Sequence, residues 1–263
     1  MKDLLCTTDL TPAADAALLH ALALADRLGA RVTLLHVLGK AERTAEQRAQ
    51  VQAAMEQQVL AAGGTEAVRI LLIEGDFMEG IVEESGKGHR LLVMGTHGPH
   101  GIRQSLFGAD ILKLVRRANA PSFVVQAGSN GDVGLAHMVL PVAGHHNIAK
   151  LMDAVCELAL ANTTEVHVFQ VMRPGEQPSD ELLANKLAMI QRLEQDGIRC
   201  VEANIPQSGF SLGFSGATIA YAKEIGAGAI AIMAHASEEY RYIADAEKER
   251  ILANEALIPV LCA

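Results

Sequence analysis

Short apolar runs alternate with longer amphipathic stretches through the first half of the chain. The runs are rich in Leu, Val and Ile and predict buried strands, whereas the stretches between them have the period of helices that cover a sheet. The expected strands are residues 2–8, 31–37, 67–74, 90–95 and 121–126. The expected helices are residues 12–28, 43–62, 77–86 and 108–118. This alternation indicates a parallel sheet with crossover helices.

Clear end signals bound the first expected helix. Thr11 can cap its N-terminus, Pro12 suits the first helical position, where a backbone N–H has no partner, and Gly29 can end it. The second expected helix ends at the pair Gly63-Gly64. These signals fix two of the expected helices independently of their apolar pattern.

The same order of strands and helices returns in the second half of the chain. LLCTTDLT at 4–11 corresponds to MVLPVAGH at 138–145, and LLHV at 34–37 corresponds to VFQV at 168–171, both with an offset of 134 residues. LLVMGTHG corresponds to AIAIMAHAS and APSFVV to IPVLC with offsets of 138 or 139, so a few residues are inserted between the early and late pairs. The pattern indicates an internal duplication.

We therefore expect an α/β protein with two tandem domains. The stretch AGSNGDVG at 127–134 has the Gly, Ser, Asn and Asp content of a linker. It separates a domain at 1–127 from a domain at 135–263. Each is expected to be an open parallel five-stranded sheet with helices on both faces.

The composition narrows the function classes. Half of the residues are hydrophobic and 20% are charged, which is typical of a folded globular protein. The net charge of −9 without a basic run argues against a nucleic acid or an anionic membrane as the main partner. No apolar stretch approaches the roughly 18 residues of a membrane span. The N-terminus does not resemble a signal peptide. The four cysteines lack metal-binding spacing. We expect a cytoplasmic protein.

Candidate ligand-binding residues follow the expected strands, because open parallel sheets bind ligands beyond the carboxyl ends of their strands. Thr7-Thr8-Asp9-Leu10-Thr11 follows the first strand, Val37 closes the second, and a glycine-rich loop begins at Gly95 after the fourth. Glycines let the backbone approach a ligand, and free amides before the helix at Gly108 favour phosphate oxygens. The loop lacks the GxxxxGK[ST] pattern, and no GxGxxG follows the first strand.

The spacing Gly95-x2-Gly98-x9-Gly108, together with Asp9 at the end of the first strand, resembles the nucleotide-binding pattern of the universal stress protein family, G-x2-G-x9-G-[ST]. The resemblance covers both halves of the chain and extends to the PSFVV ending of the first. It implies an adenine-nucleotide α-hydrolase-like, Rossmann-like fold. By this likeness Asp9 would contact the adenine, Val37 would line its pocket, and the glycines would face the ribose and the phosphates. The nucleotide-contacting candidates are Thr8, Asp9, Val37, Gly95, Thr96, Gly98, Gly101, Gly108 and Ala109.

The last candidate departs from the family pattern. Ala109 stands where the family has Ser or Thr, so one hydroxyl expected on the phosphates is missing. The loss of a neutral hydrogen bond costs about 0.5–1.5 kcal/mol, which lowers affinity without abolishing binding. We expect ATP, or AMP or ADP, in the first domain, and Asp110 could contact a magnesium ion through water.

The second copy keeps the fold pattern but not the binding motif. Aligned on the strands, Asp9 corresponds to Ala143, Gly95 to Ala234 and Gly98 to Ser237. The region opposite Gly108 is Ala246-Glu247-Lys248-Glu249, whose carboxylates would repel a phosphate. The stretch SEEYRYIADAEKERILANEA predicts a helix through the former loop. We expect a structural or regulatory second domain without the site.

Other functions have weaker sequence support. His97 and His100, and the pair His145 and His146, lack further ligands at metal-binding spacing, so we expect solvated loop histidines. No lysine lies in the loop and no evident base orients a water, so any ATPase activity would be slow. A scaffold that binds no nucleotide remains an alternative, and an adenylating enzyme would need the SGGxDS loop, which is missing. The last strands, PSFVV and IPVLC, should lie at sheet edges, which need pairing or covering. The family resemblance implies that the two copies pair these edges as an internal pseudo-dimer, and two chains could associate as a homodimer.

Overall fold

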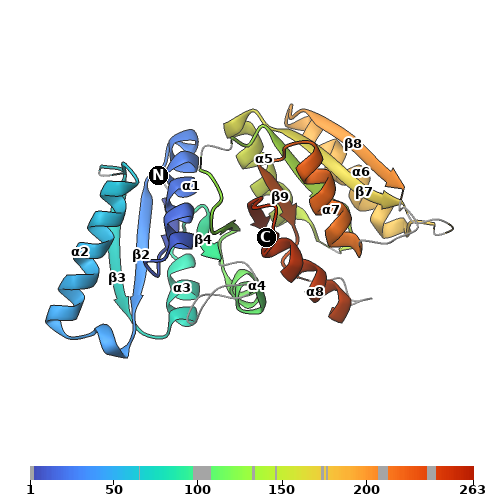
Figure 1. Cartoon of the computed structure of the whole chain (residues 1–263). Coiled ribbons are helices and arrows are strands. Elements are labelled where there is room, and N and C mark those ends of the chain that lie inside the picture. The colour runs from blue at the N-terminus through green and yellow to red at the C-terminus, as the bar shows by residue number, and fades with distance from the viewer. Residues whose placement is uncertain are drawn as a thin grey trace. The chain divides into compact units, whose positions relative to one another are not determined.

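A computed structural model describes residues 3–64, 66–96, 108–131, 134–145, 147–172, 175, 177–206, 213–235 and 241–263. The chain divides into two compact units, residues 1–132 (unit 1) and 133–263 (unit 2). Strands and helices alternate throughout both units (Figure 1). The expected α/β fold class with parallel sheets is thereby confirmed.

Unit 1 contains a parallel sheet in the strand order β3-β2-β1-β4-β5. Its strands are β1 (Leu4–Thr7), β2 (Val32–Leu38), β3 (Val68–Glu74), β4 (Leu92–Thr96) and β5 (Ser122–Gln126). Its helices are α1 (Pro12–Leu28), α2 (Ala45–Ala61), α3 (Phe77–Ser85) and α4 (Gly108–Arg117), and a short 3₁₀ helix, η1 (Lys40–Glu42), precedes α2. Strands β1, β2 and β5 are buried along their whole length, which explains their continuous apolar sequence.

The chain direction across this sheet reverses between β1 and β4. Because crossover connections are right-handed, α1 and α2 cover one face and α3 and α4 cover the other. Side-chain contacts agree: Gln58 of α2 donates to Asp15 of α1 at 2.6 Å, and Arg117 of α4 pairs with Glu79 of α3 at 2.7 Å. A reversal of this kind is where ligands bind in open parallel sheets.

Helix α1 has the bounds that its end signals predict. Pro12 is its first residue, and Gly29 ends it in the left-handed conformation with φ 58°, donating its N–H to the Ala25 and Asp26 carbonyls. Thr11 has the extended backbone of an N-cap but makes no side-chain capping bond. Its hydroxyl instead donates to Asp9 Oδ1 at 2.5 Å. The turn before α1 is thus stabilised by Asp9.

Unit 2 has the same topology, with the strand order β8-β7-β6-β9-β10. Its strands are β6 (His137–Pro141), β7 (Glu165–Met172), β8 (Cys200–Pro206), β9 (Ala229–Ile232) and β10 (Val260–Cys262). Its helices are α5 (Ala149–Asn162), α6 (Asp180–Gln195), α7 (Gly213–Glu224) and α8 (Arg241–Leu252). Helix α8 lies within the stretch that the sequence predicts to be helical in place of the loop.

All four cysteines are free thiols, and Cys6, Cys156 and Cys262 are buried. Burial raises the pKa of these three thiols, so they are unreactive core residues. Among the described helices, none combines the length and apolar character that a bilayer span requires.

A buried histidine gives unit 1 a pH-dependent stability. His20 of α1 lies 3.0 Å from the Ser129 hydroxyl, and burial lowers its pKa from 6.5 to about 4. Between these values the unfolded chain binds a proton that the folded chain does not, so stability is lost as the pH falls from 6.5 toward 4. At pH 5 the loss from this residue is about 2 kcal/mol.

Replacing this imidazole should remove that part of the pH dependence. We expect His20→Gln to flatten the fall in the free energy of unfolding between pH 7 and pH 5 relative to wild type. Urea unfolding of both proteins at several pH values measures it. Parallel curves for the two proteins would show that folding does not lower the pKa of His20.

Candidate functional site

The turn after β1 is held by its own side chains. The Thr8 N–H donates to the Leu35 carbonyl at 2.8 Å and so continues the β1–β2 ladder. The buried Thr8 hydroxyl donates to Gln58 Oε1 at 2.9 Å and accepts the Leu10 N–H at 3.0 Å. Gln58 also reaches Asp15, so α2 is bound to both β1 and α1. Thr8 therefore positions the turn rather than offering a free hydroxyl.

Asp9 is the exposed polar group of this turn. Its Oδ1 accepts the Thr11 N–H at 3.2 Å and the Thr11 hydroxyl, and the described residues provide no bond to Oδ2. The next residue, Leu10, has φ 61°, a left-handed conformation that costs a residue with a Cβ about 1–2 kcal/mol. Strained backbone of this kind concentrates at functional sites. One carboxylate oxygen thus builds the turn, and the described residues leave the other without a hydrogen bond.

Val37 lies toward the carboxyl end of β2 and is 8% exposed. A Cβ added at Gly80 of α3 would meet Val37 Cγ2 at 3.3 Å, so this side chain packs under α3. Its position in the strand is as expected for a pocket wall, but helix packing already accounts for its burial.

Gly95 has a packing role that the motif does not reveal. A Cβ added there would lie 2.3 Å from the Ala13 carbonyl oxygen and 2.9 Å from the Ala14 nitrogen. These atoms belong to the first turn of α1, which rests directly on β4. Thr96 is fully buried, and its carbonyl accepts the Ala127 N–H at 2.9 Å. Gly95 is therefore required by the contact between α1 and β4, whether or not a ligand approaches it.

The remaining candidates lie along the loop that leads to α4. Gly98 and Gly101 lie outside the described residues. Helix α4 begins at Gly108, as predicted, followed by Ala109. Asp110 pairs with Lys113 at 3.4 Å. Because β1 and β4 are neighbouring strands, the structure brings together the turn at Asp9 and the strand end at Gly95 and Thr96.

One hollow among the described residues does not coincide with these candidates. It is an open groove of about 440 Å³ between α1 and α2, with Leu10 and Asp15 on its edge. None of the nine candidates lines it. We assign it no role in the site.

Strand register corrects the correspondence between the two copies. Leu5 pairs with Leu92 in unit 1, and the counterpart of Leu5, Val139, pairs with Ile230. Leu92 and Ile230 differ by 138 positions, so Gly95 corresponds to Met233 and not to Ala234. The sequence alone left offsets of 138 and 139 open because both align apolar residues.

Lys248 of α8 occupies the strand end that corresponds to the candidate site. It is buried, and its Nζ donates to the Met233 carbonyl at 2.7 Å and to the His235 carbonyl. The neighbouring Glu247 accepts the Ser215 N–H at 2.5 Å at the start of α7, where a carboxylate complements the helix dipole. In unit 2 side chains of the chain itself thus satisfy the groups around this strand end.

The sequence analysis missed one polar cluster. His137, Glu165 and His167 gather at the amino ends of β6 and β7. Only loop histidines had been considered as metal ligands. The alternation of polar and apolar residues in EVH indicates that Glu165 and His167 share one face of a strand. The pairing of Glu165 with His137, however, depends on strand register.

The fold and the strand-end residues define a class: parallel α/β proteins with a Rossmann-like sheet in each of two units. Residues 1–126 match the model of the universal stress protein family. The match spans nearly all of the N-terminal unit and just under half of the chain. No curated protein matches the sequence.

Solved structures support the fold of the whole chain. A universal stress protein from Archaeoglobus fulgidus DSM 4304 is similar with a TM-score of 0.72 and 16% identity, over 99% of this chain and 97% of that chain. A putative universal stress protein from Pseudomonas aeruginosa UCBPP-PA14 has a TM-score of 0.58 and 16% identity, over 100% of this chain and 92% of that chain. Both similarities show the fold and extend through unit 2.

The contact between α1 and β4 can be tested with one methyl group. We expect Gly95→Ala to lower the free energy of unfolding by about 3 kcal/mol, because backbone atoms cannot move away from the new Cβ. Gly39→Ala is the control, since its Cβ would meet only a Glu42 oxygen at 3.5 Å. Chemical unfolding measures both, and equal stabilities would contradict the packing role of Gly95.

Lys248 should stabilise unit 2. We expect Lys248→Met to cost about 2 kcal/mol, because the two carbonyls lose a buried donor. The exposed Lys223 of α7 provides the control, Lys223→Met, with an effect within about 0.5 kcal/mol. Thermal unfolding of the two variants measures the difference, and a neutral Lys248→Met would mean that water replaces the ammonium.

Proposed function

We propose that unit 1 binds an adenine nucleotide, ATP or AMP or ADP, at the carboxyl ends of β1 and β4. The observation that carries the proposal is the turn at Asp9. It holds one carboxylate oxygen in the turn and leaves the other without a described partner, at the point where the strand order reverses. The spacing from Gly95 through Gly98 to Gly108 is that of the family's nucleotide-binding pattern.

The proposed roles follow the chemistry of each group. The Asp9 carboxylate accepts hydrogen bonds from the base, and the amides that precede α4 face the phosphates, where the helix dipole favours negative charge. Ala109 provides no hydroxyl, so the loop amides carry the phosphate interaction. Asp110 offers a carboxylate that a magnesium ion could contact through water.

The proposed activity is binding, with a regulatory role in a stress response, rather than turnover. The sequence from Gly95 to Gly108 contains no lysine, no carboxylate pair is placed in the motif to hold magnesium, and no evident base orients a water for phosphoryl transfer. Free, unreactive thiols are compatible with the reducing cytoplasm, which we propose as its location.

A second candidate function is an interaction scaffold that binds no nucleotide. Two observations favour it: Ala109 replaces the expected hydroxyl, and Gly95 is already required by the packing of α1. The two functions differ in whether the purified chain carries or takes up nucleotide.

We expect the gently purified chain to release adenine nucleotide on acid treatment, near one per chain by chromatography, and Asp9→Ala to lose it. The loss of a hydrogen bond to a charged group weakens affinity by about tenfold or more. Thr11→Val is the matched control, since it removes the hydroxyl partner of Asp9 but keeps the carboxylate. It should retain the nucleotide.

Each other outcome contradicts a part of the proposal. Two nucleotides per chain would mean that unit 2 also binds. Loss in both Asp9→Ala and Thr11→Val would mean that the turn, and not the carboxylate, is what matters. A chain that is empty and gives no heat with added ATP would establish the scaffold function.

A further inference from the structure

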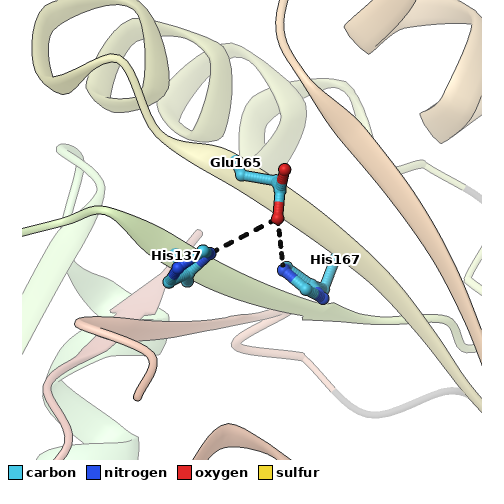
Figure 2. Close-up of side chains that lie close together, drawn as sticks. All are labelled: His137, Glu165 and His167. Atoms are coloured by element: carbon cyan, nitrogen blue, oxygen red, sulfur yellow. Dashed lines mark hydrogen bonds and ion pairs between the residues drawn. The ribbon is translucent and has the colours of Figure 1, made fainter. Parts of the chain in front are cut away.

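Three metal-ligating side chains share one face of the unit 2 sheet. His137 is the first residue of β6 and pairs in register with Glu165, the first residue of β7. His167 follows two positions later and so points to the same face as Glu165. Figure 2 shows the carboxylate between the two imidazoles. The cluster lies at the amino ends of the strands, whereas the candidate nucleotide site lies at the carboxyl ends in unit 1.

The separations of the donor atoms suit a single small cation. Glu165 Oε1 lies 3.5 Å from His137 Nδ1 and 3.1 Å from His167 Nε2. One ligand atom from each residue lies within 4.8 Å of the others. Ligands about 2.05 Å from a tetrahedral zinc ion are about 3.4 Å apart. Small side-chain rotations would therefore bring all three onto one ion.

His137 Nδ1 has no hydrogen bond in this arrangement. The atom is shielded from solvent and, within the described part of the chain, only the ion-pair contact with Glu165 reaches it. A buried polar atom without a hydrogen bond is costly unless a ligand satisfies it. This nitrogen is the one that a bound cation would use.

The surroundings hold the other two ligands in place. The Tyr221 hydroxyl lies 2.8 Å from His167 Nδ1, and its ring stacks on Phe169 with centroids 4.9 Å apart. A partner on the second ring nitrogen is what orients a metal-binding histidine. Arg199 lies 3.6 Å from Glu165 Oε2, which leaves Oε1 for the imidazoles.

The side chains also leave a path for an ion. The exposed fraction of the side chain is 8% for His167, 22% for Glu165 and 39% for His137. The cluster is therefore buried at His167 and open to solvent at His137. Water can complete the coordination from that side.

Unit 1 provides an internal comparison. With the offset of 134 residues, the three positions correspond to Asp3, Arg31 and Thr33. There Arg31 pairs with Asp3 at 3.8 Å and the Thr33 hydroxyl donates to Asp3 at 3.5 Å. An ion pair is thus sufficient to satisfy the charged groups at this position in the fold. In unit 2 all three positions carry residues that ligate first-row metals.

We propose that His137, Glu165 and His167 bind one zinc ion, or a similar first-row divalent cation, with water as the remaining ligand. Two imidazoles and one carboxylate form a donor set that suits zinc. Without the metal, His167 Nε2–H donates to Glu165 and the Tyr221 hydroxyl donates to Nδ1. With the metal, Nε2 ligates, its proton is carried on Nδ1, and Nδ1–H donates to the Tyr221 oxygen.

Calorimetric titration of the full, tag-free chain with zinc chloride tests the proposal. We expect one ion per chain. His137→Asn and His167→Gln should each weaken binding by about 100-fold, and Tyr221→Phe by about tenfold, because it disturbs only the orientation of His167. Arg199→Ala should bind zinc as tightly as wild type or more tightly, since it removes a positive charge near the cation. Cobalt(II), titrated as an optical probe, should give the absorption of a tetrahedral ion.

Competing histidines are controlled by the double variant His145→Ala/His146→Ala, which should keep wild-type affinity. The proposal is overturned if that double variant loses zinc, if His137→Asn binds as wild type does, or if wild type gives no heat. If His167→Gln does not fold, His137→Asn still decides, because that side chain is 39% exposed and its replacement leaves the core intact.

Discussion

The first turn of α1 rests on the backbone of β4 at Gly95, and the arrangement of unit 1 around its strand ends depends on this contact. It fixes how close the helix comes to the sheet, and so how short the connection from β1 can be. That connection is residues 8–11, with Leu10 in a strained conformation and Asp9 holding Thr11. In unit 2 the corresponding connection is residues 142–148, three residues longer, and the position of Gly95 carries Met233. The longer connection and the larger side chain thus occur together in unit 2.

The groups at the strand ends also differ between the two units. In unit 1 the turn presents a carboxylate oxygen that the described residues leave without a partner. In unit 2 the strand end is covered by Lys248, and Glu247 accepts the amide at the start of α7. A likeness in fold therefore does not imply the same groups at the strand ends, because in unit 2 the chain's own charged side chains satisfy them.

Much of the fold could be predicted from the sequence, because buried parallel strands have continuous apolar sequences and α1 has distinct signals at both ends. The candidate site was only partly predictable. Thr8 and Val37 were identified by position, but their hydroxyl and methyl groups are engaged by Gln58 and by α3. The packing role of Gly95 requires the helix position, and its counterpart was displaced by one residue because Met233 and Ala234 are both apolar. The cluster around Glu165 depends on the register of strands that are 28 residues apart, which the order of residues alone does not fix.

The ammonium of Lys248 satisfies the carbonyls at the end of β9 without a diffusible ligand. A group tethered to the chain is present at a constant effective concentration, so the stability that it provides does not vary with the composition of the solution. A diffusible ligand acts differently, since it stabilises the folded state by an amount that grows with its concentration relative to its dissociation constant. Under the proposed function, the nucleotide concentration would therefore change the stability of unit 1, whereas the stability that Lys248 gives to unit 2 would stay constant.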